Sequence, residues 1–430
     1  MKKDKLLMTS IILSLVLTIV LGNSATFDIS GGLYKGMPIK ITELLMGINL
    51  VILLIKKRNN ITLIKSFNIL FIWIAYGLLM ILVNSYNFGY TFKQMAYGAL
   101  YAFRLAFYMI YVYYVINYFK DLKFKFGKLT DIYVYSYSAV AFIGILQLIF
   151  YPKAVDFYAL LKNFHIYLLN PDPHENRLIS TYLDPNFLGT ISSIPIIVCL
   201  AKLITHDFSK HLKKGLMYIV FLILLTFMVA LTVSRSGIGT LMVSLFIFVL
   251  ASVRIENRKL YIENFKRFFI AILGMVAIIF TSYYLSHSHV VKRIVEIKTD
   301  PSAQARVVSW TQATKVIQKN NPIFGVGYNM YGFVKGATDR VTSFGVDSSI
   351  MLILATTGAI GIIIFALYVL STLKNIFVIR NTKNFYVGNA VMAVFIGSIA
   401  GSNFNNLLFY PLWLLPFFVL SNYYILVNKD

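Results

Sequence analysis

Long apolar stretches alternate with short polar segments along almost the whole chain. An apolar run of about 20 residues crosses a bilayer as a helix, because lipid offers the backbone no hydrogen-bond partner. The pattern predicts twelve such helices near 6–22, 39–55, 66–85, 94–118, 132–151, 186–204, 215–233, 237–253, 268–285, 347–373, 385–402 and 407–427. We therefore expect residues 1–430 to form one all-α domain, a polytopic membrane helix bundle with no soluble domain attached.

The first apolar stretch follows a basic start and could be read as a secretory signal peptide. Asn23-Ser24-Ala25 offers a weak cleavage site after it. Because eleven further spans follow, we expect an uncleaved first helix, with cleavage as the alternative.

Basic residues gather in alternate connecting segments. Lys and Arg number 40, and 24 of them lie in 1–5, 56–65, 119–131, 202–214, 254–267, 374–383 and 428–430. With twelve spans all these segments fall on one side, which is the cytoplasmic side because short basic loops stay inside. We expect a protein of the cytoplasmic (inner) membrane with both termini in the cytoplasm.

Composition narrows the class of protein. Charged residues make up 13% of the chain and hydrophobic residues 58%, against about 25% charged residues in soluble domains. Polar surface is too scarce to cover a soluble globule, which argues against a soluble enzyme or a nucleic-acid partner despite the net charge of +23. The single cysteine, Cys199, excludes a disulfide framework.

Two long segments, 152–185 and 286–346, are expected on the outer side. The second holds eight basic residues, namely Lys292, Arg293, Lys298, Arg306, Lys315, Lys319, Lys335 and Arg340. A basic pocket there suits an anionic substrate such as a phosphate. A solvated loop beside anionic lipid headgroups is the alternative.

Two arginines lie in or next to the apolar stretches. Arg104 falls about 15 Å inside the fourth span by helix rise, where an arginine needs a polar cavity or a partner. It either lines a headgroup cavity or pairs with Glu43. Arg235 lies in a short outer turn at the start of the next helix, which indicates an anion site. Snorkelling of Arg235 to headgroups is the alternative.

The pattern predicts an amphipathic helix near 301–319 on the outer side. Asp300 can cap it, and Pro301 suits its first turn. One stripe of this helix combines Arg306, Trp310, Ala313 and Ile317. The stripe indicates a helix that lies on the outer surface or over a cavity.

A glycine turn and an aspartate follow this helix. Gly325 and Gly327 indicate a tight turn but only a weak phosphate signal, since no Walker lysine accompanies them. Asp347 opens the tenth span and is either a helix cap or a general base in a basic cavity.

A metal site is not expected. Asp172, His174 and Glu175 lie close together in the 152–185 loop, but neighbouring prolines break any helical face that they could share. We expect no metal and no cofactor.

Several segments together resemble the polysaccharide polymerase and O-antigen ligase superfamily. The matching residues are Tyr182–Gly189, Ser234–Gly237, Arg306 with Trp310, Pro322–Gly327, Asp347–Ser349 and Ala355–Gly361. Their order and spacing match over roughly residues 180–375. The resemblance implies a helical bundle that transfers a glycan from undecaprenyl diphosphate to an acceptor outside the membrane, without metal.

The resemblance also implies roles for individual residues. Arg235 and Arg306, with Arg340 and the deeper Arg104 as further candidates, bind the diphosphate, and Asp347 is the general base. The residues expected to form the substrate loops are Asp184, Asn186, Trp310, Gly325 and Gly327. Ligases typically have a histidine where this chain has Asp347, so the resemblance favours a polymerase.

The leading hypothesis is a polymerase of undecaprenyl-diphosphate-linked oligosaccharide repeat units for a capsule, exopolysaccharide or O-antigen. A ligase-type transferase of finished glycan is the second hypothesis, and a polysaccharide transporter or flippase is the third. The partners expected are the lipid-linked oligosaccharide, membrane lipid, and chain-length regulator and flippase proteins.

Overall fold

The computed structural model describes most of the chain, in ranges separated by gaps. The described residues are 2–24, 26–27, 39–56, 62, 64–150, 177–252, 266, 269, 272–277, 301–336, 345–379 and 385–428. Their elements are α1 (Lys2–Leu21), β1 (Thr26–Phe27), β2 (Ile39–Lys40), α2 (Ile41–Ile55), α3 (Lys65–Phe88), α4 (Phe92–Asp121), α5 (Phe126–Phe150), η2 (Ser180–Tyr182), α7 (Pro185–Ile191), α8 (Ser193–Thr205), α9 (Leu212–Leu231), α10 (Arg235–Ser252), α13 (Pro301–Lys319), α14 (Tyr331–Val334), α15 (Ser349–Ile379), α16 (Phe385–Gly401) and α17 (Pro411–Asn428).

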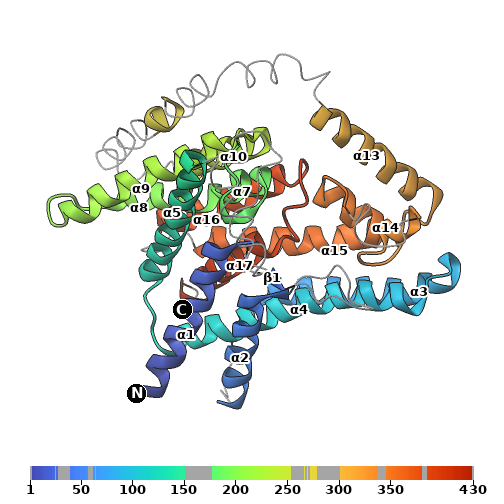
Figure 1. The fold of residues 1–430 in the computed structure, drawn as a ribbon. Coiled ribbons are helices and arrows are strands. Elements are labelled where there is room, and N and C mark those ends of the chain that lie inside the picture. The colour runs from blue at the N-terminus through green and yellow to red at the C-terminus, as the bar shows by residue number, and fades with distance from the viewer. Residues whose placement is uncertain are drawn as a thin grey trace.

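Helices dominate the described residues, and their length fits a membrane (Figure 1). Within the described ranges, nine helices are long and apolar enough to cross a bilayer, and α2 and α16 are shorter apolar helices. The expected all-α polytopic membrane bundle is confirmed. Most of the span expected at 268–285 lies outside the described residues. Strand structure in the described ranges is limited to the antiparallel pair β1–β2, in which Thr26 pairs with Lys40.

Two spans form the centre of the bundle. The continuous apolar segment of α7 and α8 and the helix α17 are each 83% buried, whereas the other candidate spans are half-buried or less. The outer helices expose large apolar side chains, such as Leu82, Phe103 and Ile149. Such exposure suits helices whose outward faces contact lipid.

Small residues allow the closest helix contacts. Gly189 on α7 faces Gly237 on α10, and a Cβ added to Gly237 would lie 2.7 Å from the Gly189 carbonyl carbon. On α16, a Cβ at Gly401 would meet the Thr240 side chain of α10. Glycines at such contacts let helix backbones approach within membranes. The close approach brings the start of α10 beside α7.

Helix α15 is broken at Gly358, and an irregular segment fills the break. Gly358 has φ 64° and ψ −166°, a backbone conformation essentially restricted to glycine. The segment 322–327 crosses the break and makes four backbone hydrogen bonds to α15. These are Val326 N to Ala355 O (3.1 Å), Gly327 N to Thr356 O (2.8 Å), Ala359 N to Pro322 O (2.9 Å) and Ile360 N to Ile323 O (3.2 Å). The hydrogen bonds that the helix loses at its break are thus replaced by the loop.

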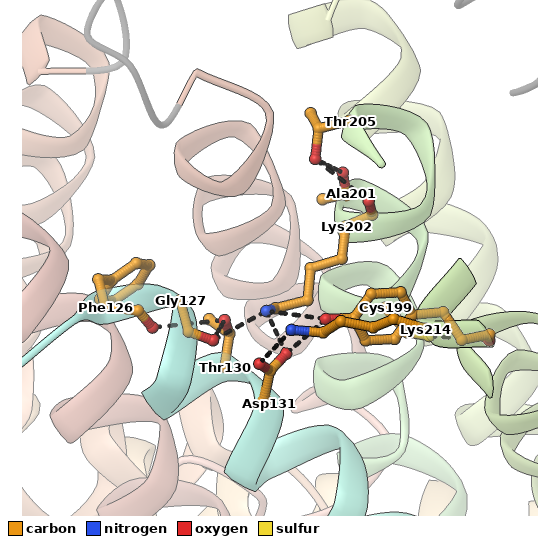
Figure 2. Close-up of polar contacts among 10 residues, drawn as sticks. Phe126, Gly127, Thr130, Asp131, Cys199, Ala201, Lys202, Thr205 and Lys214 are labelled. Carbon is orange, nitrogen blue, oxygen red and sulfur yellow. Dashed lines mark hydrogen bonds and ion pairs between the residues drawn. The ribbon is translucent and has the colours of Figure 1, made fainter. Parts of the chain in front are cut away.

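An ion cluster joins α5, α8 and α9 at the end of the bundle away from the α9–α10 turn (Figure 2). Asp131 on α5 pairs with Lys202 on α8, and its other oxygen lies 3.1 Å from Lys214 Nζ on α9. Tyr218 on α9 donates its hydroxyl to Asp131 at 2.6 Å. The side chains of Asp131 and Lys202 are only 15% and 11% exposed. Three helices therefore depend on one buried carboxylate.

Candidate functional site

Segments distant in the sequence meet at one end of the bundle. The N-terminus of α7, the turn between α9 and α10, helix α13, the start of α15 and the turn before α17 all lie there. The turn before α17 joins two of them, since Ser349 donates its hydroxyl to Asn406 (3.1 Å) and Asn405 donates its amide to Thr190 on α7 (3.1 Å). These contacts hold the start of α15 close to α7.

The α7 start is built around Asp184 and Asn186. Asp184 caps α7, because its Oδ1 accepts hydrogen bonds from the backbone N–H groups of Asn186 (2.7 Å) and Phe187 (2.9 Å). The Asn186 side-chain oxygen accepts a hydrogen bond from the Ser234 hydroxyl at 3.1 Å. The two sequence motifs Tyr182–Gly189 and Ser234–Gly237 therefore contact each other.

Arg177, which belongs to none of the sequence motifs, strengthens this junction. Its Nε donates to the Thr232 carbonyl at the end of α9 (2.8 Å), and its Nη2 donates to Asn186 Oδ1 (3.2 Å) and to the Val233 carbonyl (3.4 Å). A guanidinium suits the negative end of a helix. In the sequence, Arg177 is one basic residue near the end of a long loop. It belongs to no motif or spacing that would have marked it as part of the site.

Arg235 is the first residue of α10 and is partly buried. The preceding Ser234 accepts the Gly237 backbone N–H at 3.1 Å, which fixes the start of the helix. Arg235 therefore lies at the positive end of α10, the position that the sequence predicts for an anion site.

Helix α13 holds Asp347 against the start of α15. Ser309 accepts the Asp347 backbone N–H (3.2 Å), and the Trp310 indole N–H donates to the Asp347 carbonyl (3.4 Å). On the same helix, Ala313 is fully buried and packs with Trp310 and Ile317. The apolar stripe of α13 thus faces the protein.

The carboxylate of Asp347 does not cap α15. Ser348 takes that position, because its hydroxyl accepts the Met351 backbone N–H at 3.2 Å. Partial burial raises the pKa of Asp347; the positive charge of Arg306 opposes this rise, and the negative charge of Asp184 adds to it. A carboxyl group with a raised pKa beside an arginine suits a proton acceptor. The site thus brings Arg306 and Asp184 within electrostatic range of Asp347.

The two loop glycines are buried and their N–H groups are already used. Gly325 N donates to Asn321 O at 2.8 Å and Gly327 N donates to Thr356 O at 2.8 Å. Both residues have positive φ angles, 74° and 105°. Glycine is needed at both positions because the loop must fit into the break of α15. The part of these glycines in a substrate loop stays a prediction. Trp310 lies nearer the candidate site, against Asp347.

Arg104 forms the ion pair that the sequence offered as its alternative. Its Nη2 lies 2.5 Å and its Nε 2.8 Å from Glu43 Oε1, and Tyr108 donates its hydroxyl to the same oxygen. Arg104 also lines a cavity of 410 Å³. The remaining lining residues are Asn23, Lys40, Trp73, Tyr97, Tyr101, Leu105, Tyr108, Phe187, Tyr328, Asn329, Leu352, Thr356, Asn406, Phe409, Tyr410 and Pro411. Arg104 is thus both paired and placed on a cavity wall.

Some predicted residues lie outside the described ranges. Arg340, the fourth diphosphate-binding candidate, is one of them, as are Asp172, His174 and Glu175, the weak metal candidates, and the helix cap Asp300.

Comparison with known proteins gives a family for part of the chain. No curated protein matches the sequence. The family described as O-antigen ligase matches residues 220–366. This segment contains Arg235, Arg306 and Asp347 and runs from within α9 to within α15. Over this segment the chain is similar to the O-antigen ligase family, and the match supports the resemblance to the O-antigen ligase and polymerase superfamily.

Proposed function

We propose that this protein joins undecaprenyl-diphosphate-linked oligosaccharide repeat units into a surface polysaccharide. The reaction takes place on the outer face of the cytoplasmic membrane, with both termini in the cytoplasm. The single observation that carries the proposal is the position of Asp347. Its carboxylate does not cap α15 and lies within electrostatic range of Arg306. This pair combines a proton acceptor with a group that attracts phosphate.

The chemistry needs both kinds of residue. An acceptor sugar hydroxyl attacks the anomeric carbon of the donor, and the bond from that carbon to the diphosphate oxygen breaks. The leaving diphosphate takes the bonding electron pair, and the Asp347 carboxylate takes the hydroxyl proton. The negative charge on the diphosphate grows during this step, so arginines in fixed positions stabilise the transition state more than the ground state.

Arg235 and Arg306 are the arginines proposed for the diphosphate. Arg235 adds its charge to the positive end of α10, and Arg306 reaches the site from α13. Bidentate guanidinium contacts suit phosphate oxygens. Glu43 already neutralises Arg104, so we give that residue no direct part in the transfer.

Asp347 also favours polymerisation over ligation. The ligase pattern typically has a histidine where this chain has an aspartate.

Helix α13 fixes the position of the base relative to Arg306. Ser309 and Trp310 of this helix hold the Asp347 backbone, and Arg306 lies on α13 as well. We therefore place the acceptor hydroxyl between α13 and the start of α15.

Deletion of the gene and complementation in the native host test the proposal. Loss of long surface chains with accumulation of single lipid-linked repeat units is the result expected for a polymerase. Asp347→Asn and Arg235→Ala should give the same result at normal protein levels. Asp207→Asn, at an exposed turn between α8 and α9, is the matched control and should restore full polymer.

Other outcomes point to the alternative functions. Normal chains that fail to reach their final acceptor would indicate a ligase. Absence of repeat units from the outer face would indicate a flippase. Full polymer from both Asp347→Asn and Arg235→Ala would contradict the mechanism.

A further inference from the structure

The cavity beside the candidate site has a charged residue that the proposed transfer does not use. Its volume of 410 Å³ is within the range of about 300–1,000 Å³ typical of small-molecule sites. Lys40 lines it at the start of α2 and is only 5% exposed. The amine of a buried lysine therefore faces a space large enough for a ligand.

Among the described residues, Lys40 Nζ forms no ion pair with a carboxylate, although Glu43 lies within electrostatic range and accepts the Lys40 backbone N–H at 3.1 Å. Its Nζ donates to Asn23 Oδ1 at 2.9 Å and lies 5.7 Å from the centre of the Tyr410 ring. The nearby Glu43 pairs instead with Arg104 and accepts the Tyr108 hydroxyl. A buried charge is unfavourable unless an opposite charge accompanies it. The cavity is the place from which a ligand can supply that charge.

The walls of the cavity are aromatic and carry hydroxyl groups. Phe187 and Tyr410 stack at 4.2 Å between ring centres, and Tyr97 and Tyr101 line the wall from α4. Tyrosine combines an apolar ring face with a polar tip, which suits the mixed surface of a sugar ring. A cation together with such walls selects a sugar that bears an acidic group.

The cavity adjoins the candidate site directly. Phe187 follows the α7 cap formed by Asp184, and Asn406 accepts the hydroxyl of Ser349 at the start of α15. Both Phe187 and Asn406 line the cavity. A glycan that reaches Asp347 can therefore extend into it.

We propose that this cavity binds an acidic sugar of the glycan and that Lys40 pairs with the sugar carboxylate. The inference rests on the proposed function, because it takes the ligand to be the glycan handled at Asp347. Arg104 stays paired with Glu43 and forms part of the wall, while Lys40 provides the charge that selects the substrate.

Two disaccharides that differ in one carboxylate test the proposal. Full-length protein in neutral detergent is titrated with cellobiouronate and with cellobiose, and the dissociation constants are measured by calorimetry. Because Lys40 forms a charged hydrogen bond with the carboxylate that cellobiose lacks, we expect cellobiouronate to bind about ten- to a hundredfold more tightly than cellobiose. Equal affinities would overturn the proposal without the use of any variant.

Lysine variants at the two ends of α2 provide the matched comparison. Lys40→Met should remove the preference for cellobiouronate, and Lys40→Arg should retain most of it. Lys56→Met, at the opposite end of the same helix, removes a partly exposed lysine paired with Asp4 and should leave the preference unchanged. A preference that survives Lys40→Met would overturn the proposal.

Tryptophan fluorescence tests where cellobiouronate binds, and inorganic phosphate tests whether the site requires a sugar. Trp73 lines the cavity, so cellobiouronate should change the tryptophan fluorescence of the wild type but not of Trp73→Phe. Persistence of the change in Trp73→Phe would place binding elsewhere and overturn the proposal. Inorganic phosphate that binds as tightly as cellobiouronate would overturn the requirement for a sugar.

The two proposals can fail separately. Loss of polymer in Asp347→Asn without any preference for cellobiouronate would leave the proposed function standing and overturn only this inference. Full polymer in Asp347→Asn together with a preference that depends on Lys40 would overturn the transfer mechanism and leave an acidic-sugar site.

Discussion

Replacement of Gly358 by alanine should destabilise the whole bundle. A Cβ at this position would lie 2.3 Å from the Ile323 carbonyl oxygen and 2.6 Å from the Gly325 backbone nitrogen. Both atoms belong to the backbone, so no side-chain rotation can relieve the contact. The φ of 64° adds strain of about 1–3 kcal/mol for a residue with a Cβ.

The larger part of the effect comes from withdrawal of the 322–327 segment. It makes four backbone hydrogen bonds across the break of α15, and each contributes about 0.5–1.5 kcal/mol. With the strain at Gly358 included, we expect a loss of at least about 3 kcal/mol. Gly239→Ala is the matched control, because nothing lies within 4 Å of a Cβ at that exposed position on α10.

Heating of detergent-solubilised protein, followed by size-exclusion chromatography, measures the effect. Gly358→Ala should lose its monodisperse peak at a clearly lower temperature than the wild type, and Gly239→Ala should match or exceed the wild type. Equal melting temperatures for the two variants would refute the view that the loop and the helix break stabilise each other.

Four further predictions concern charged groups. Arg306→Ala should lower polymer formation by about 10²–10³-fold at unchanged thermal stability, measured with lipid-linked donor in vitro; an unchanged rate would remove Arg306 from the mechanism. The activity should fall as the pH is lowered through a midpoint above 3.8, because Asp347 has a raised pKa and must be deprotonated to accept a proton. Arg306→Gln should move the midpoint in the pH–rate profile further up, since Arg306 lowers that pKa; a downward shift would contradict this coupling. Asp131→Asn should destabilise the protein by about 3 kcal/mol in thermal unfolding, because buried Lys202 loses its carboxylate, whereas exposed Asp207→Asn should change little.

The fold class was predictable because the bilayer permits few structures. Without water, the backbone must satisfy its own hydrogen bonds, so apolar stretches of sufficient length predict helices regardless of their tertiary contacts. The Arg104–Glu43 pair was one of two predicted alternatives, since an arginine at that depth needs a polar cavity or a partner and Glu43 was available.

The details of the site depend on tertiary contacts that the sequence does not reveal. Asp347 and Ser348 are both good helix caps, and only the geometry assigns the cap to Ser348. Lys40 and Arg177 belong to no motif, and their burial or bonding depends on partners far along the chain. Gly325 and Gly327 indicated a tight turn and only weakly a phosphate site, because a glycine that fits a helix break and one that binds phosphate look alike in sequence.

The break in α15 has a consequence for the order of membrane insertion. The Ala355 and Thr356 carbonyls receive their hydrogen bonds from 322–327, and this segment is itself held by Asn84 and Tyr90 through the Gly325 and Val326 carbonyls. Alone in lipid, α15 would expose unpaired backbone groups. We therefore expect the segment, which is made before α15 during synthesis, to reach its place against the end of α3 before α15 is exposed to lipid.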